Sequence, residues 1–94
     1  MPDEKSADEQ PSEPQPDFLF LVRNLATQVL ISLGEFPHPV SKQKDVDLDS
    51  ARFSIELLAM LQAKTRGNLE EIEDRYLDAL LHDLRVKYVA ATKG

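Results

Sequence analysis

The sequence predicts an all-α domain built from three helices, and three observations lead to this class. Apolar residues recur at spacings of three and four, the period of an amphipathic helix, and they do not alternate as they would in a strand. Gly34 and Gly67 stand where two of these patterns end, as glycines that follow helices do. Pro37 and Pro39 separate the first pattern from the second, because a proline and the residue before it both disfavour helical geometry.

A charged segment precedes the helical patterns. Residues 1–16 hold five acids and one lysine, which account for four of the chain's six net negative charges, and four of its six prolines. Because apolar side chains are almost absent here, burial cannot offset the entropy lost on ordering. We therefore predict a disordered, acidic and proline-rich tail over residues 1–16 and one helical domain over residues 17–94. The tail's charge would keep the domain soluble.

The first helix is expected over residues 17–33, with Asp17 as its N-cap and Gly34 just past its end. Two apolar residues, Phe20 and Ile31, fall on the side opposite its main stripe. A helix that is apolar nearly all round is usually buried all round, against a core or a partner. The segment is shorter than the roughly 20 apolar residues of a membrane span, so no span is expected. The main stripe consists of Leu19, Leu21, Val22, Leu25, Ala26, Val29, Leu30 and Leu33.

The second helix is expected over residues 48–66, after an N-cap at Asp47 or Asp49 and before Gly67. It also has more apolar residues than one face requires. Its inner stripe consists of Leu48, Ala51, Ile55, Leu58, Ala59 and Gln62, whereas Phe53, Leu57 and Met60 cluster on another side.

The third helix is expected over residues 69–91, because Asn68 and Glu71 have the spacing of a capping box. The link that Gly67 and Asn68 form is so short that the second and third helices must pack as an antiparallel hairpin or meet at an angle, and we expect the hairpin. The predicted inner stripe consists of Leu69, Ile72, Tyr76, Leu77, Leu80, Leu84, Tyr88 and Ala91.

The surplus apolar residues are the most informative feature for function. They are Phe20, Ile31, Phe53, Leu57 and Met60, and we take them as a candidate interface. A three-helix core could bury them, but monomers rarely expose large apolar patches, and a domain this small gains from association. We therefore expect a non-catalytic module that forms a homo-oligomer, most simply a dimer, or binds another protein.

The alternative function is a carrier that holds an apolar small molecule or a lipid between its helices. Phe18, Phe20, Phe53 and Met60 would line such a site.

Few residues point to chemistry. His38 lies between two prolines, and Asp74, Asp78 and His82 form a row along the third helix, which we interpret as a solvated face. Without cysteine, thiol chemistry and disulfides are excluded. Because no phosphate loop or nucleophile motif is present either, we assign no catalytic, cofactor or metal residue and expect no enzyme.

Charge and the N-terminal residues give two further expectations. The chain has no basic stripe, which argues against nucleic-acid binding. It begins Met-Pro-Asp-Glu-Lys, unlike a signal peptide, so a cytoplasmic location is expected.

Four segments of the body resemble a bacterial family of small proteins, DUF1844, a domain of unknown function. They are residues 25–39 (LATQVLISLGEFPHP), 46–52 (VDLDSAR), 61–69 (LQAKTRGNL) and 80–89 (LLHDLRVKYV). The resemblance covers about residues 18–89 and implies a small soluble domain, with no catalytic residue that could be assigned here.

Overall fold

The structure, a computed structural model, describes residues 16–93, and these residues form three helices and no strand. Helix α2 spans Phe18–Ser32, α3 spans Leu48–Lys64 and α4 spans Glu71–Lys93. The all-α class is therefore confirmed, with each helix within two residues of its expected bounds. The tail expected over residues 1–16 lies outside the described residues, apart from Pro16.

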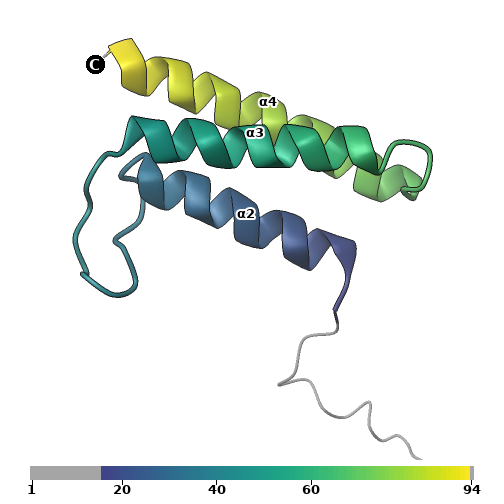
Figure 1. Ribbon diagram of the computed structural model, residues 1–94, viewed down its shortest axis with the longest axis horizontal. Coiled ribbons are helices and arrows are strands. Elements are labelled where there is room, and N and C mark those ends of the chain that lie inside the picture. Colours follow the sequence, from purple (N-terminus) through teal and green to yellow (C-terminus); the bar gives the residue numbers. More distant parts are fainter. Residues whose placement is uncertain (1–15, 94) are drawn as a thin grey trace, which may run out of the picture.

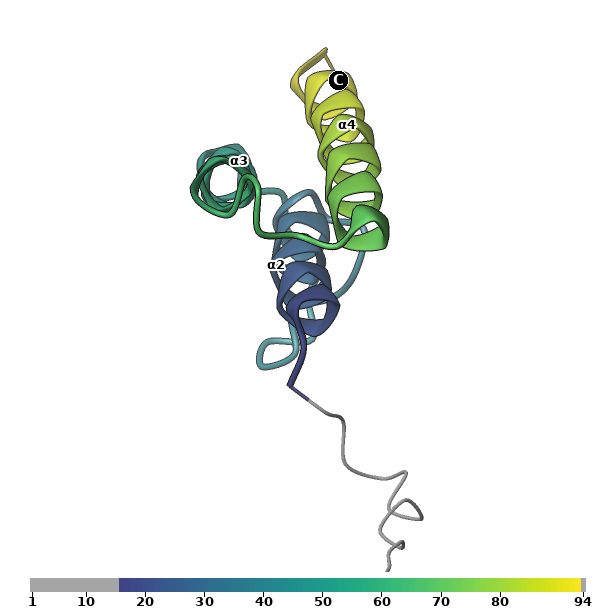
Figure 2. The same cartoon turned by 90° about the vertical axis from the view of Figure 1, so that its right-hand side faces the viewer.

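The three helices pack side by side, with α3 antiparallel to both α2 and α4 (Figure 1). Figure 2, which looks along α3, shows α2 and α4 at the other two corners of a triangle. The expected hairpin of α3 and α4 is present. None of the helices over residues 16–93 is long and apolar enough to cross a membrane, in agreement with the expectation from the sequence.

Local hydrogen bonds explain where α2 begins and ends. The Asp17 carboxylate accepts a hydrogen bond from the Phe20 N–H at 2.7 Å, so this residue is the expected N-cap. At the other end Gly34 has φ +82°, and the Glu35 N–H donates to the Leu30 carbonyl at 2.9 Å. That bond and the left-handed glycine together form a Schellman motif.

The N-cap of α3 is Asp47, one of the two residues expected. Its carboxylate accepts hydrogen bonds from the Ser50 N–H at 3.1 Å and the Ser50 hydroxyl at 2.8 Å. The backbone hydrogen bond from Ser50 is the main cause that lowers the pKa of the Asp47 carboxyl, since it stabilises the charged form. The Asp47 N–H also donates to the Ser32 carbonyl at 2.7 Å, which fastens the start of α3 to the end of α2.

The capping box expected at Asn68 and Glu71 is wrong by two residues. The Glu73 carboxylate accepts a hydrogen bond from the Glu70 N–H at 2.9 Å, so Glu70 occupies the N-cap position and α4 begins at Glu71. The Asn68 N–H instead donates to the Thr65 carbonyl at 2.9 Å, within the turn that ends α3. Asn68 and Glu70 are each followed by a glutamate three residues later, and the turn decides which pair is used.

The core lies between all three helices and is small. It is formed by Val22, Ala26, Val29 and Leu33 from the α2 region, Ala51, Ile55 and Leu58 from α3, and Leu77, Leu81 and Leu84 from α4. The sequence placed most of these correctly. It was wrong about Leu21 and Ile72, which are 45% and 65% exposed, and it missed Leu81, which is 1% exposed.

Candidate interaction surface

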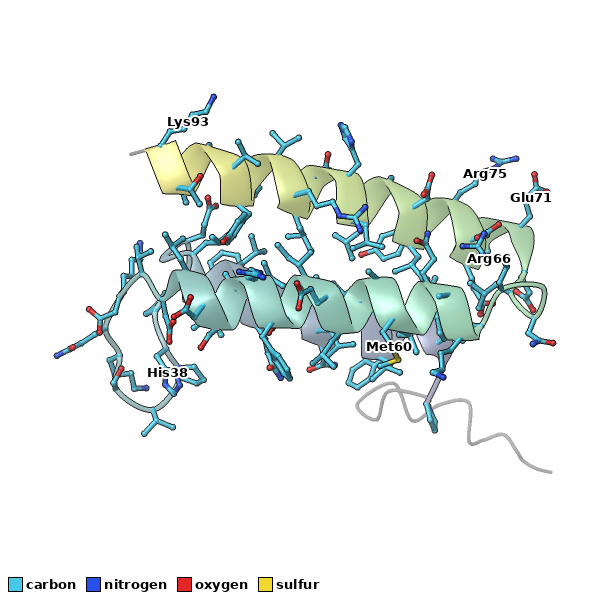
Figure 3. The ribbon with its side chains drawn as sticks, turned by 45° about the horizontal axis from the view of Figure 1, so that its top comes forward. His38, Met60, Arg66, Glu71, Arg75 and Lys93 are labelled. Atoms are coloured by element: carbon cyan, nitrogen blue, oxygen red, sulfur yellow. The ribbon has the colours of Figure 1, made fainter. Side chains whose placement is uncertain are left out.

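Side chains from α2 and α3 form an exposed apolar strip, which we call the α2–α3 surface: Phe20, Leu21, Phe53, Leu57 and Met60. Phe53 is 63% exposed, and Phe20, Leu21 and Met60 are each more than 40% exposed, whereas Leu57 is half-buried. Because Phe53, Leu57 and Met60 are four and three residues apart, they lie on one side of α3. Figure 3 shows Met60 at the edge of α3 that borders α2.

The register of the two helices brings residues of α2 onto the same strip. A groove between them is lined by Gln28 and Ser32 of α2 and by Ser50, Phe53 and Ser54 of α3, among others. Because the helices are antiparallel, Leu21, seven residues before Gln28, lies opposite the last turns of α3, which contain Leu57 and Met60. Phe20 adjoins Leu21 and turns further outward, since successive helix residues differ by about 100°.

Four of the five predicted interface residues therefore belong to the α2–α3 surface, and Leu21, which the sequence assigned to the core, completes it. Ile31 lies apart. It follows Phe20 by eleven residues, which is about 16 Å along the helix. There it is half-buried and lines a small cavity with His38, Asp47 and residues between them. This side chain is covered in part by the loop and contributes little to an open surface.

The loop around His38 is held by hydrogen bonds within itself. The His38 N–H donates to the Gln43 carbonyl at 2.9 Å, and the Lys42 N–H donates to the His38 carbonyl at 2.8 Å. The His38 Nδ1 atom accepts the Val40 N–H at 3.0 Å. Lys42 adopts φ +64°, a left-handed conformation that this tight turn requires. The imidazole thus helps to fold the loop.

The row of Asp74, Asp78 and His82 is exposed, as expected for a solvated face. The Asp78 carboxylate accepts a hydrogen bond from the Gln62 side-chain amide at 3.4 Å, and so links α4 to α3. A polar groove at the α3–α4 turn is lined by Asp74 and Asp78 together with Arg66 and Arg75. Over residues 16–93 no three His, Asp or Glu side chains are grouped so that they could hold a metal ion.

The aromatic lining expected for a carrier is not gathered inside the domain. Phe18 packs against the core, whereas Phe20, Phe53 and Met60 are directed to the surface.

A second apolar face lies on α4 and was missed in the sequence. It contains Ile72, Val86 and Val89, which are all about half exposed or more. The signal that could have found it is the spacing of fourteen residues between Ile72 and Val86, with Ala79 midway, since seven residues make nearly two turns. Because Ile72 was expected on the inner stripe, the repeat on the outer side was not recognised.

These features define a small all-α domain of three helices with two exposed apolar faces. The chain belongs to the family DUF1844, described as a domain of unknown function, whose model matches residues 15–90. This confirms the resemblance seen in the sequence. No curated protein and no solved structure matches the chain.

Proposed function

We propose that the protein is a non-catalytic protein–protein interaction module, and that the α2–α3 surface is a contact site. The exposure of Phe20, Leu21, Phe53 and Met60 along one strip carries this proposal. Single exposed apolar residues are ordinary on a protein surface, but large side chains gathered on two adjacent helices favour an interface. Aromatic residues and methionine are also the types enriched where proteins meet.

The available polar groups support binding over catalysis. Asp74, Asp78 and His82 are exposed on α4, and His38 is engaged in its own loop. A general acid or base works in a cleft that excludes water and tunes its pKa, and these side chains face solvent instead. The occupant of the α2–α3 surface is another protein or a second copy of the chain.

The proposal is tested with the full chain and a pair of charge substitutions on the surface. Burying Phe53 in a partner would contribute about 1–2 kcal/mol, the value of a fully buried Phe scaled by its present exposure. Phe53→Asp should therefore weaken association by about tenfold or more, because it also buries a carboxylate. Met60→Asp should act in the same direction.

Val40→Asp is the matched control, because Val40 is 82% exposed on the loop and lies outside the surface. Tagged wild-type and variant chains are compared by pulldown from the native host and by sedimentation, with circular dichroism to confirm helicity. A partner that Phe53→Asp loses and Val40→Asp keeps supports the proposal. If the wild-type chain and all three variants retain the same partners, the α2–α3 surface is not the contact site.

Native mass spectrometry of the purified protein separates the carrier alternative from this proposal. A carrier retains an apolar molecule as added mass, and Phe53→Asp would release it. Unmodified mass in the wild-type chain argues against a carrier.

A further inference from the structure

The outer face of α4 repeats every seven residues. Successive members of one row, Ile72, Ala79 and Val86, are seven residues apart. A second row contains His82 and Val89, which are also seven apart and follow Ala79 and Val86 by three residues. We call these five residues the α4 outer face. All five are exposed, whereas Leu77, Leu81 and Leu84 on the opposite side are buried against α2 and α3. Arg75, seven residues before His82, lies in the same row, so the repeat is apolar at Ile72, Ala79, Val86 and Val89 and polar at Arg75 and His82. A seven-residue repeat is the pattern with which one helix pairs along the length of another.

Charge along α4 changes sign from one end to the other. From Glu71 to Asp78 the helix has four acids and one base, whereas from Ala79 to Lys93 it has one acid and three bases. Figure 3 shows Glu71 and Arg75 at one end of α4 and Lys93 at the other, all on the side away from α3. A second α4 laid antiparallel would set its basic end beside the acidic end of the first, at both ends of the contact. A parallel copy would set acids beside acids.

The charged residues along one edge of the α4 outer face are also complementary between two antiparallel copies. Glu71, Asp78 and Arg85 are seven residues apart and so lie along one edge of the face. In an antiparallel pair centred between Ala79 and His82, the same edges of the two helices meet. Arg85 then comes within reach of Glu71 and Asp78 of the second copy, and the symmetry repeats this contact.

The shape of the surface around Val89 fits the same arrangement. A groove of about 470 Å³ between α3 and α4 is lined by Ile55, Ala59, Tyr88 and Val89, together with the charged residues Arg52, Glu56 and Arg85. An antiparallel pair centred at Ala79 and His82 brings Ile72 of the second copy level with Val89, where this mainly apolar groove can accept it. The small side chain of Ala79 allows the two backbones to approach at the centre.

We propose that a second copy of this chain docks antiparallel along the α4 outer face, forming a twofold dimer whose axis passes near Ala79 and His82. The inference goes beyond the proposed function, because it assigns self-association to α4 and leaves the α2–α3 surface to another protein. It rests on the apolar repeat, the reversal of charge along α4 and the groove beside Val89. A twofold contact of this kind is self-complementary and closes, so assembly stops at two chains.

The first test measures the dissociation constant of the dimer by sedimentation equilibrium with the full chain. Ala79→Asp should raise the dissociation constant about tenfold or more, since the twofold axis brings the two introduced carboxylates close together in each dimer. Val40→Asp is the matched control and should leave the dissociation constant unchanged, because Val40 is 82% exposed on the loop and lies outside both apolar faces. A wild-type chain that is monomeric at hundreds of micromolar overturns the inference, and so does a dimer that only Phe53→Asp disrupts.

The second test exchanges charges. Arg85→Glu places two further acids against the acidic end of the partner and should weaken the dimer about tenfold, most strongly at low salt. Adding Glu71→Arg should recover most of that loss. If Arg85→Glu acted only on the fold of its own chain, Glu71→Arg would not rescue it, because Glu71 lies about four turns away on the same helix. Failure of the rescue therefore contradicts the antiparallel register.

The third test reads the orientation directly, because the chain has no cysteine of its own. Ala79→Cys lies beside the axis and should form a disulfide-linked dimer on mild oxidation. Val89→Cys alone should not, because its copies lie about 25 Å apart along the helices. A mixture of Ile72→Cys and Val89→Cys chains should cross-link to each other. Efficient cross-linking of Val89→Cys to itself would indicate a parallel pair and overturn the proposal.

These outcomes keep the two proposals separate. Loss of a foreign partner through Phe53→Asp, with an intact dimer, supports both. A monomeric wild-type chain that still loses a partner through Phe53→Asp overturns the α4 dimer and leaves the proposed function standing.

Discussion

Leu81 and Ile72 give the most direct test of the packing of α4, because the sequence pattern and the structure assign them opposite roles. Leu81 is 1% exposed within the core, and Ile72 is 65% exposed on the α4 outer face. Truncating a buried leucine to alanine costs about 2–5 kcal/mol, from lost transfer energy and the cavity that remains. Truncating an exposed isoleucine changes the free energy of unfolding by less than about 0.5 kcal/mol, with a small gain in helix propensity.

The expected loss at Leu81 is comparable to the whole stability of such a domain, about 3–5 kcal/mol. Leu81→Ala should therefore be largely unfolded at room temperature. Leu81→Met keeps the volume and should cost less than about 1.5 kcal/mol, so it supplies a folded variant on which the free energy can be measured. Urea titrations followed by circular dichroism give the free energy for wild type, Leu81→Met and Ile72→Ala.

Protein concentration separates packing from association in this assay. If Ile72 lies in a dimer contact, Ile72→Ala lowers stability only at concentrations where the wild type is dimeric, since binding stabilises the folded state by mass action. At low concentration the wild type and Ile72→Ala should have nearly the same free energy of unfolding. A cost at Ile72 equal to that at Leu81, measured at low concentration, would refute the orientation of α4.

Three further predictions concern the helix ends. Gly34→Ala should lower the free energy of unfolding, measured by urea titration, by about 1–3 kcal/mol, because φ +82° is strained for alanine and its Cβ would lie 3.0 Å from the Val46 side chain. An unchanged urea midpoint would contradict the Schellman motif. The pKa of Asp47 is lowered in the folded state, so its charged carboxylate stabilises the fold above the ordinary carboxyl pKa, and this stabilisation is lost as the pH falls through the folded value. Asp47→Asn should therefore flatten the acid limb of a plot of the free energy of unfolding against pH. A profile identical to that of the wild type would count against the cap. Glu73→Ala should lower the free energy of unfolding by about 0.5–1.5 kcal/mol, because the hydrogen bond to the start of α4 is lost, whereas Asn68→Ala should be nearly neutral. A larger loss for Asn68→Ala than for Glu73→Ala would instead support the capping box expected at Asn68 and Glu71.

The sequence was sufficient for the class, the number of helices and the two glycine-terminated ends. Asp17 and Gly34 act locally, through hydrogen bonds and backbone angles within four residues, and such signals survive in the sequence alone. The start of α4 is different. Asn68 with Glu71 and Glu70 with Glu73 have the same spacing, and only the turn that follows Thr65, which uses the Asn68 N–H, selects the second pair.

The candidate surface was harder to predict, because periodicity finds apolar faces but does not say which neighbour each face meets. Leu21 has the position of a core residue on α2, yet the antiparallel register with α3 leaves it at the edge of the strip. Ile31 has the position of an exposed residue, yet the loop that contains His38 covers it in part. On α4 the stripe chosen from the sequence included Ile72 and omitted Leu81, and this single shift concealed the outer face.

The two apolar faces differ in chemistry, and the difference bears on what each can recognise. The α2–α3 surface consists of aromatic and long flexible side chains, and methionine in particular adapts to irregular partners. Apart from His82, the α4 outer face has small and β-branched side chains. It is flanked by charges that reverse along the helix, and such charges fix both register and orientation. A second copy of the chain supplies the reversed order of charges by symmetry, whereas a foreign partner would need that order in its own sequence. The specific pattern on α4 therefore favours a second copy of the chain, as we propose, whereas the permissive α2–α3 surface favours binding to varied partners.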